Sequence, residues 1–361
     1  MRDLGFNPEV MKRFTPILIL IFTLFQSCSE SQVKTDPIAE AMLVVQRVNG
    51  GWPKHLQIRG EKELKTQYKK LNLTDEELAT INRDSAKLNT TYDNYATSKE
   101  IRYLIKAYHE TQNPAYLKAA QKGIQFILDG QYANGGWPQF YPLKGGYADD
   151  ITYNDNAMVN SLNILRDIVR SENGFEVVDS KFIKPSEVAI EMGIDCILKT
   201  QIKIDDKLTV WCAQHDRETF APSKARAYEL PSLSGQESVG IIEFLMGIKN
   251  PSPEVINAIQ KAMQWVDENK IEGYGIIFPE APGTKRGFDR VLVEKDGSVL
   301  WARFYDLETG KPFFCGRDGV KKDAMSEIEI ERRIGYGWYG DWPAKLLNEK
   351  YQEWKRRNGI E

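Results

Sequence analysis

Gly135-Gly136-Trp137-Pro138 is the stretch that decides the fold, because the same four residues occur earlier as Gly50-Gly51-Trp52-Pro53. Each copy is followed by an Asp-Asn pair that opens a helical pattern, Asp93-Asn94 after the first and Asp155-Asn156 after the second. A motif that recurs between paired helices is typical of helical hairpins stacked around an axis. We therefore predict a mainly α protein, an α/α toroid, although repetition alone would fit any toroid.

The helices between these motifs can be read from their apolar spacing. Ile101, Leu104, Ile105 and Tyr108 recur at i, i+3, i+4 and i+7. Asn113 then supplies a cap and Pro114 a first helical residue for the next helix. Further helices are predicted at residues 156–170, 187–200, 237–248, 253–269 and 343–357.

The apolar spacing changes near residues 288–315, where apolar and polar residues alternate approximately. Lys295-Asp296-Gly297 has the composition of a hairpin turn, and residues 308–311 that of a second turn. We predict a small antiparallel β insertion there. The run at residues 208–213 is also rich in β-forming residues.

The N-terminus has the pattern of an export signal. Lys12 and Arg13 precede an apolar run at residues 17–25, which is too short to span a bilayer as a helix. Cys28 follows it and resembles the lipidated cysteine of a bacterial lipoprotein, with ordinary signal cleavage as the alternative. We expect a signal peptide at 1–28, a tether at 29–38 and a catalytic domain at 39–361, on a protein that is exported and held to the cell envelope.

Composition limits the chemistry. The net charge of −3 argues against a nucleic-acid partner, so an acidic ligand must be held by locally placed cations. Cys196, Cys212 and Cys315 have no metal-binding spacing and are expected to be small buried residues. With three histidines in the chain, any metal should be a hard cation bound by oxygen atoms.

Residues 209–238 concentrate ionisable side chains between two ordered elements, as a site on a rigid scaffold does. A solvated loop is the alternative for this stretch taken alone. Six further motifs occur in order along the chain: Thr91-Tyr-Asp-Asn, Gly135-Gly-Trp-Pro, Tyr153-Asn-Asp-Asn-Ala-Met, Arg286-Gly-Phe-Asp-Arg, Trp301-Ala-Arg-Phe-Tyr and Gly316-Arg-Asp-Gly-Val. Together with residues 209–238 they resemble the family 10 polysaccharide lyases, which are pectate lyases. The resemblance covers nearly all of the chain after the signal region and implies an incomplete (α/α) barrel.

Asp93 and Asp155 precede predicted helices, where an aspartate alone is most often a cap. Their repetition in equivalent places suggests that the loops of neighbouring hairpins bring the two carboxylates together. Carboxylates with nearby amides suit calcium. The resemblance implies that Asp93 and Asp155 bind calcium and that Asp93 also contacts substrate.

Arg303 and Arg317 offer planar forks that fit a carboxylate, and the resemblance implies that they bind uronate groups. The resemblance also implies Arg226 as the catalytic base, which removes a proton from C5 of galacturonate. An arginine base is physically awkward, since guanidinium is almost always protonated. His215 is the chemical competitor, because its ordinary pKa suits a base near neutral pH, and Lys224 is another neighbour.

We therefore expect a calcium-dependent pectate lyase that cleaves polygalacturonate by β-elimination, acts as a monomer and meets the membrane only through a lipid at Cys28. A non-catalytic, glycan-binding surface lipoprotein is the alternative. The Gln131-x-x-Asn-Gly-Gly-Trp137 segment is also similar to the Gln-Trp repeat of terpenoid-cyclase toroids, but no Asp-rich diphosphate motif accompanies it. Trp52 and Trp137 are predicted to pack the ends of helical hairpins rather than to bind sugar.

Overall fold

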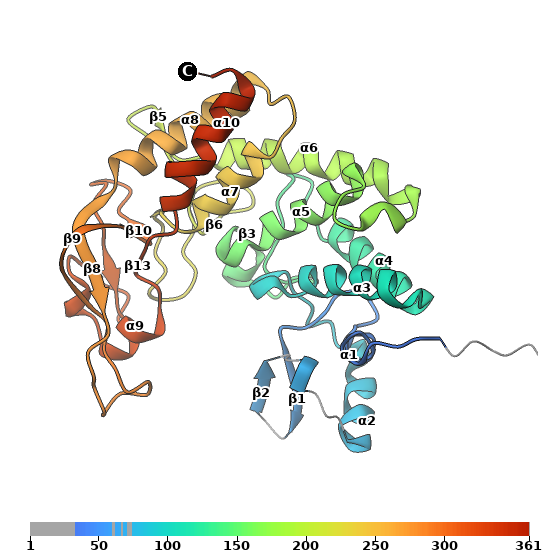
Figure 1. Cartoon of the computed structure of the whole chain (residues 1–361). Helices are drawn as coiled ribbons and strands as arrows, with labels where there is room; N and C mark the ends of the chain where they lie inside the picture. The colour runs from blue at the N-terminus through green and yellow to red at the C-terminus, as the bar shows by residue number, and fades with distance from the viewer. Residues whose placement is uncertain (1–32, 60–61, 66–67, 71–73, 361) are drawn as a thin grey trace, which may run out of the picture. The chain divides into compact units, whose positions relative to one another are not determined.

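The computed structural model describes residues 33–59, 62–65, 68–70 and 74–360. Helices dominate the described residues and the strands are mostly short, so the prediction of a mainly α protein is confirmed (Figure 1). The described residues contain ten α-helices: α1 Pro37–Val45, α2 Asp75–Arg83, α3 Ser98–Thr111, α4 Pro114–Asp129, α5 Ala157–Arg170, α6 Ile183–Thr200, α7 Glu237–Met246, α8 Pro253–Glu268, α9 Ile330–Gly335 and α10 Tyr351–Asn358. A π-helical turn at Leu346–Lys350 leads into α10.

Seven of these helices form two rows. Along one row α1, α4, α6 and α8 are neighbours, and along the other α3, α5 and α7 are neighbours. The rows pack on each other through α3 on α4, α5 on α6 and α7 on α8 (Figure 1). This is the arrangement that stacked helical hairpins produce.

The helix patterns predicted from sequence are present. In α4 the Asn113 side chain accepts a hydrogen bond from the backbone N–H of Ala115 at 3.1 Å, and Pro114 begins the helix. Its predicted apolar face is mostly buried, Ile124 and Ile127 completely so. Burial of an amphipathic face, rather than intrinsic propensity, supplies most of the stability of such a helix.

Repeated side chains join one hairpin to the next. The Nε2 of Gln46 donates to the carbonyl of Gly50 and to that of Ala119 on the neighbouring helix α4. Gln131 and Gln201 each make the same pair of bonds one and two hairpins later, to a loop carbonyl and to the next helix. One amide thus satisfies two buried carbonyls at each step along the row.

Four buried tryptophans close the ends of the same hairpins. Each indole N–H donates at 2.8 Å to a carbonyl near the end of the preceding helix: Trp52 to Met42, Trp137 to Ile127, Trp211 to Ile197 and Trp301 to Val266. All four rings are almost completely buried. The prediction that Trp52 and Trp137 pack rather than bind sugar is confirmed.

Glycine is required in both copies of the repeated motif. Gly50 and Gly135 have φ values of 90° and 89°, which side-chain-bearing residues rarely adopt. A Cβ atom at Gly135 would lie 2.0 Å from the Met192 carbonyl oxygen, and one at Gly50 would lie 2.3 Å from that of Lys122. The loop therefore approaches the next helix more closely than any side chain allows.

The largest sheet has three antiparallel strands in the order β13-β9-β8: β13 Tyr339–Gly340, β9 Val291–Ala302 and β8 Ile271–Ile277. A β insertion is thus present, but it begins earlier than residue 288. The prediction that Lys295-Asp296-Gly297 turns the hairpin is wrong, because these residues lie within β9 and residues 278–290 make the connection. Between the pairs Glu272↔Val299 and Tyr274↔Glu294 the register shifts, so four residues of β9 bulge opposite one of β8.

Short strands complete the described structure. They are β1 His55–Arg59, β2 Lys62–Lys65, β3 Ile151–Thr152, β4 Lys203–Ile204, β5 Lys207–Leu208, β6 Gln214–His215, β7 Leu233–Ser234, β10 Phe304–Tyr305, β11 Phe314–Cys315 and β12 Lys321–Lys322. The run at 208–213 is mostly buried loop rather than strand. β3 pairs with β6 and β7 pairs with β10, which ties the loops of successive hairpins together.

The described residues from Lys34 onward form one compact unit. None of the described helices combines the length and the apolar character that crossing a membrane requires. The predicted signal, Cys28 and residues 29–32 of the tether lie outside the described residues. Residues 33–38 are described, and the predicted end of the tether is wrong, because Pro37 already begins α1. Cys196, Cys212 and Cys315 are buried and free, as expected of small buried residues.

Candidate active site

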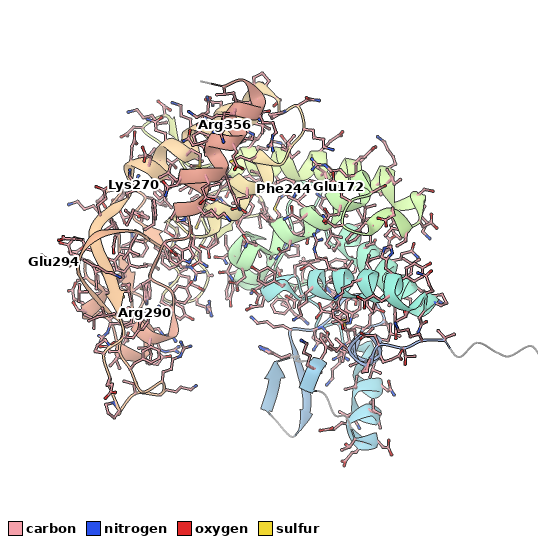
Figure 2. The ribbon with its side chains drawn as sticks, viewed as in Figure 1. Glu172, Phe244, Lys270, Arg290, Glu294 and Arg356 are labelled. Atoms are coloured by element: carbon pink, nitrogen blue, oxygen red, sulfur yellow. The ribbon has the colours of Figure 1, made fainter. Side chains whose placement is uncertain are left out.

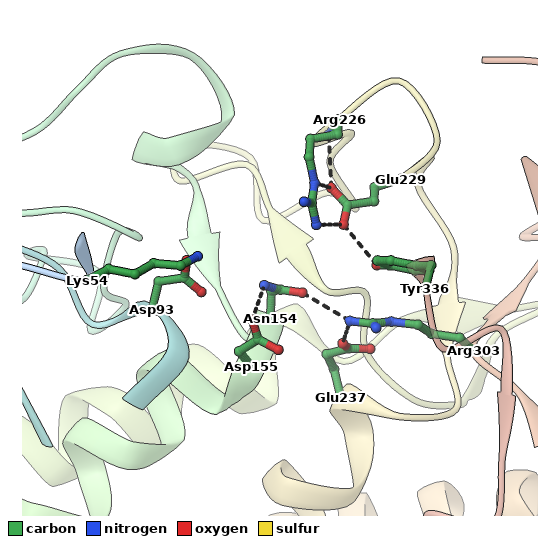
Figure 3. A network of polar contacts seen from close by, with 9 residues as sticks. All are labelled: Lys54, Asp93, Asn154, Asp155, Arg226, Glu229, Glu237, Arg303 and Tyr336. Carbon is green, nitrogen blue, oxygen red and sulfur yellow. Dashed lines mark hydrogen bonds and ion pairs between the residues drawn. The ribbon is translucent and has the colours of Figure 1, made fainter. Parts of the chain in front are cut away.

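A cleft of about 570 Å³ opens where the loops of successive hairpins meet. Asp93, Asp155 and Arg226, which were predicted from distant parts of the sequence, all line it (Figure 3). The other lining residues are Lys54, His55, Asn89, Asn94, Gln139, Phe140, Tyr147, Asn154, Gln214, Glu229, Gly335 and Tyr336. The cleft wall is therefore polar and carries charges of both signs.

Two similar turns present the carboxylates, but not from equivalent positions. Each turn follows a tyrosine with φ of −97°, Tyr92 in one and Tyr153 in the other, and its second residue has φ of 51°. Those second residues are Asn94 and Asp155. Asp93 therefore corresponds to Asn154, and the predicted equivalence of Asp93 with Asp155 is wrong by one residue. Both carboxylates still face the cleft.

The two aspartates form a small negative centre. Asp93 is 1% exposed, and its Oδ2 lies 2.5 Å from Nζ of Lys54. Its buried Oδ1 has no hydrogen-bond partner among the described residues. Burial, and then the charge of Asp93, raise the pKa of Asp155. One lysine therefore faces two adjacent carboxylates, and one buried carboxylate oxygen is left without a partner among the described residues.

This donor set fits a hard cation. Oxygen atoms of Asp93, Asp155 and nearby amides are the ligands that calcium prefers. The described residues hold no group of three or more Asp, Glu, His or Cys side chains that could bind a metal. A calcium ion here would therefore need further oxygens from amides, water or an acidic ligand.

Arg303 lies behind the cleft wall rather than on it. Its side chain forms a buried ion pair with Glu237, donates to Oδ1 of Asn154 at 3.1 Å and stacks on the ring of Tyr336 at 4.3 Å. Asn154 in turn donates to Asp155 at 3.2 Å (Figure 3). Burial lowers the pKa of Arg303, but Glu237 and the other negative groups around it together raise that pKa by more, so the side chain stays charged. Through Asn154, Arg303 thus links Asp155 to Glu237 and Tyr336.

Arg226 is held by a carboxylate. Its Nε donates to Oε2 of Glu229 at 2.6 Å and its Nη2 donates to Oε1 of the same group. The hydroxyl of Tyr336 donates to Oε1 of Glu229 at 2.8 Å. The hydrogen bonds that Arg226 donates to Glu229 raise the pKa of Arg226 above its ordinary value. In this arrangement Arg226 is a firmly protonated cation.

Arg317 lies outside the cleft-lining residues. Its side chain is 61% exposed and makes two hydrogen bonds of 3.1 Å to Glu331. Arg332 and Arg317 lower the pKa of Glu331 to about 2. Arg317 and Arg226 both lie near the ring of Tyr228, at 6.0 and 5.0 Å. Of the five predicted residues, three line the cleft. Arg303 supports the cleft wall, and Arg317 lies beside Tyr228, as does Arg226.

Comparison with known proteins decides the family. The family model for pectic acid lyase matches residues 46–347. The chain belongs to the pectic acid lyase family.

Two solved structures of the family 10 polysaccharide lyase from Cellvibrio cellulosa resemble this pectic acid lyase family member. Each is 34% identical with a TM-score of 0.73 and covers 87% of this chain, and the matches span 92% and 91% of the two solved chains. One of them is a mutant in complex with trigalacturonic acid. The predicted resemblance and the predicted class of enzyme, a lyase acting on pectic acid, are confirmed.

One curated protein shares a short local similarity with the chain. Over 54 residues the pectic acid lyase chain is 35% identical to the peptidoglycan L-alanyl-D-glutamate endopeptidase CwlK of Bacillus subtilis. The match spans 15% of this chain and 27% of that protein's length. It is too short to bear on the fold or the site.

His215 is excluded as the base of this pectic acid lyase family member. The ring is completely buried, its Nδ1 bonds the Phe220 carbonyl at 2.8 Å and its Nε2 accepts from the N–H of Cys212 at 3.0 Å. Burial lowers the pKa of His215 to about 4. Both nitrogens are thus used inside the fold.

An internal repeat explains the role of His215. Residues 211–222 and 301–312 share Trp, Asp, Glu, Thr and Pro at the same spacing. Asp216 and Asp306 each accept bonds from two backbone N–H groups and one threonine hydroxyl. Tyr305 occupies the place of His215 and accepts from the N–H of Ala302 at 3.0 Å. The imidazole is therefore a loop-closing group.

Sequence reasoning missed several cleft residues of the pectic acid lyase chain. Lys54 and Gln139 each stand two positions after a motif tryptophan, and Arg303 does so after Trp301. That shared spacing could have identified these three residues from the sequence. Glu229 and Tyr336 had no such signal, because they meet across 107 residues of sequence.

Proposed function

We propose that this chain cleaves polygalacturonate by calcium-assisted β-elimination in the cleft lined by Asp93, Asp155 and Arg226. The observation that carries the proposal is the convergence of these three side chains, in a chain that belongs to the pectic acid lyase family. The trigalacturonic acid bound by the Cellvibrio mutant, at 34% identity, supports an acidic galacturonan as substrate.

Calcium would be held by Asp93 and Asp155. The support for it is the buried, unpartnered Oδ1 of Asp93 and the raised pKa of Asp155, since two neighbouring carboxylates share a single paired lysine. When bound, the ion would neutralise a uronate carboxylate and so make the neighbouring C5 proton more acidic. Lys54, paired with Asp93, supplies a further fixed positive charge.

Arg226 would take the C5 proton. The C5–H electron pair then forms the C4–C5 double bond, the C4–O bond breaks and the departing oxygen takes a proton from solvent. The raised pKa of Arg226 means that its pair with Glu229 must open before the guanidine can act as a base. Substrate carboxylates entering the cleft compete for the same fork.

The two remaining arginines are assigned different positions in this scheme. Arg317 is exposed and would bind a uronate carboxylate at the edge of the cleft. Arg303, buried between Glu237, Asn154 and Tyr336, would act on the substrate mainly by fixing Asn154 beside Asp155.

The same proposal extends to architecture and location. The two rows of helices, joined by repeated glutamine and tryptophan bonds, support an incomplete (α/α) barrel. The apolar N-terminal run and Cys28 support export as an envelope lipoprotein, and a monomer is the expected form.

One observation favours a second candidate, a surface protein that binds galacturonan without cleaving it. Arg226 is paired with Glu229, as it would be if its role were only structural. The two functions are separated by incubating the protein with polygalacturonate and calcium and following the ultraviolet absorbance of the unsaturated product.

We expect wild-type protein and a Lys224→Ala control to produce the absorbance, because Lys224 does not line the cleft. We expect Arg226→Ala to lose at least about 1000-fold in kcat, as removal of a catalytic base does. Binding without absorbance in the wild type would establish the second candidate, and full activity in Arg226→Ala would exclude Arg226 as the base.

A further inference from the structure

A second hollow of about 560 Å³ lies next to the catalytic cleft. It is formed by β8, β9 and residues 339–341, and the cations that line it are Arg290 and Lys295. Figure 2 shows Arg290 and Glu294 on this part of the molecule. The hollow shares no lining residue with the cleft.

The cations of this hollow differ from those of the cleft. In the cleft region Lys54, Arg226, Arg303 and Arg317 each form an ion pair with a carboxylate. Arg290, Lys295 and the neighbouring Arg286 form none with any described carboxylate. The Nε of Arg290 is buried without a hydrogen-bond partner, in the part of the chain that the structure describes.

The nearby acids do not compensate these charges. Asp289 is bound by Arg333 through two hydrogen bonds of 2.9 and 2.6 Å. Glu294 does not line the hollow. Asp341 lines the hollow but makes no ion pair with either cation. Burial, and then repulsion by Arg286, lower the pKa of Arg290, as expected for a cation near a second cation.

Tyr336 connects the hollow to the cleft. The guanidinium of Arg290 donates to the Tyr336 carbonyl and lies 5.6 Å from the ring centre of Phe278. The Tyr336 hydroxyl, at the other end of the same residue, bonds Glu229 in the cleft. The two sites are therefore linked through a single residue.

We propose that the hollow at Arg290 and Lys295 is a second carboxylate-binding site, which takes a uronate group of the same polygalacturonate chain beyond the catalytic cleft. The proposal rests on the proposed function. An arginine that has no carboxylate partner among the described residues, lies near an aromatic ring and has a lysine beside it matches a carboxylate on a sugar ring. A site of this kind adds affinity for long chains through a second, linked contact and leaves the chemistry unchanged.

The test compares long and short substrates. Arg286→Gln/Lys295→Gln removes two exposed charges without touching the bond from Arg290 to Tyr336. We expect its KM for polygalacturonate to rise roughly fivefold, as loss of one lining cation and one neighbouring positive charge allows, and its KM for trigalacturonic acid to change less than twofold. Lys118→Gln/Lys203→Gln is the control with the same charge change, since both lysines are exposed elsewhere.

Each outcome decides the proposal. An unchanged polymer KM, or an equal rise for polymer and trimer, overturns it, and so does the same effect in the control. If wild-type protein cleaves nothing, the proposed function fails. The hollow is then judged by affinity electrophoresis in polygalacturonate gels, where Arg286→Gln/Lys295→Gln must be retarded less than the control.

Discussion

Arg226 and Glu229 are three residues apart and make a two-pronged ion pair that Tyr336 completes. The pair orients the guanidinium toward the carboxylates across the cleft (Figure 3). It also stabilises the protonated form, which is the wrong form for a base. Activity in this cleft should therefore increase with pH, and Glu229 should determine where the increase occurs.

Glu229→Gln tests this coupling. The hydrogen bonds that Arg226 donates to the Glu229 carboxylate raise the pKa of Arg226, so loss of that carboxylate lowers the pKa and increases the deprotonated fraction at any given pH. We expect the rising limb of kcat against pH to move to lower pH by at least about one unit. A Glu331→Gln variant, which removes the carboxylate partner of Arg317 instead, should leave the limb in place. An unshifted limb in Glu229→Gln would contradict the assignment.

Because it is buried, His215 should make the stability of the folded protein depend on pH. Its pKa is about 4 in the folded protein and near 6.5 when unfolded, so the unfolded chain binds a proton first as the pH falls. The folded state should lose about 3 kcal/mol between pH 7 and pH 4 through this residue alone. Urea unfolding at several pH values should show a shallower pH dependence in His215→Gln. His109→Gln, at an exposed histidine, should retain the wild-type dependence, and an identical slope in all three proteins would refute the argument.

Residue-level prediction from sequence worked where a motif repeats. Asp93 and Asp155 were found because loops of stacked hairpins converge, although the pattern matched them one residue out of register. Glu229 and Tyr336 could not be found, because no local pattern encodes a partner 107 residues away. From the sequence, His215 looked like a possible base. Its burial, which lowers its pKa, depends on tertiary packing and could not be predicted from the sequence.

At the level of elements, apolar periodicity predicted the helices correctly, whereas turn composition placed a hairpin turn wrongly. The helices were placed well because an apolar face at 3.6-residue spacing is a property of the segment itself. The composition of Lys295-Asp296-Gly297 was that of a turn, but pairing with β8 made it a bulge inside β9. Strand pairing depends on a distant partner, so sequence alone could not locate it.

The repeated glycine gives a sharp test of the hairpin packing. Gly135 and Gly145 have similar φ values of 89° and 86°, but a Cβ at Gly135 would lie 2.0 Å from the Met192 carbonyl, while one at Gly145 would meet nothing within 4 Å. We expect Gly135→Ala to cost about 3 kcal/mol more than Gly145→Ala in free energy of unfolding, measured with urea. Equal costs would mean that the close approach of the loop to α6 does not limit the fold.

For the whole molecule, charge is arranged locally rather than globally. The net charge is −3, yet the proposed substrate is a polyanion. Cations therefore have to be placed one by one, and those around the cleft are kept in position by carboxylates that substrate groups can replace. The unpaired cations beside β9 extend the same principle beyond the cleft.

The central claim is that Asp93, Asp155 and Arg226 act together on one galacturonate. The most direct measurement is a crystal structure of Arg226→Ala with calcium and trigalacturonic acid. We predict a calcium ion bound by Asp93 and Asp155, a uronate carboxylate on that ion, and C5 of the same sugar facing the space left at residue 226. Calcium or sugar bound elsewhere, with this cleft empty, would contradict the account.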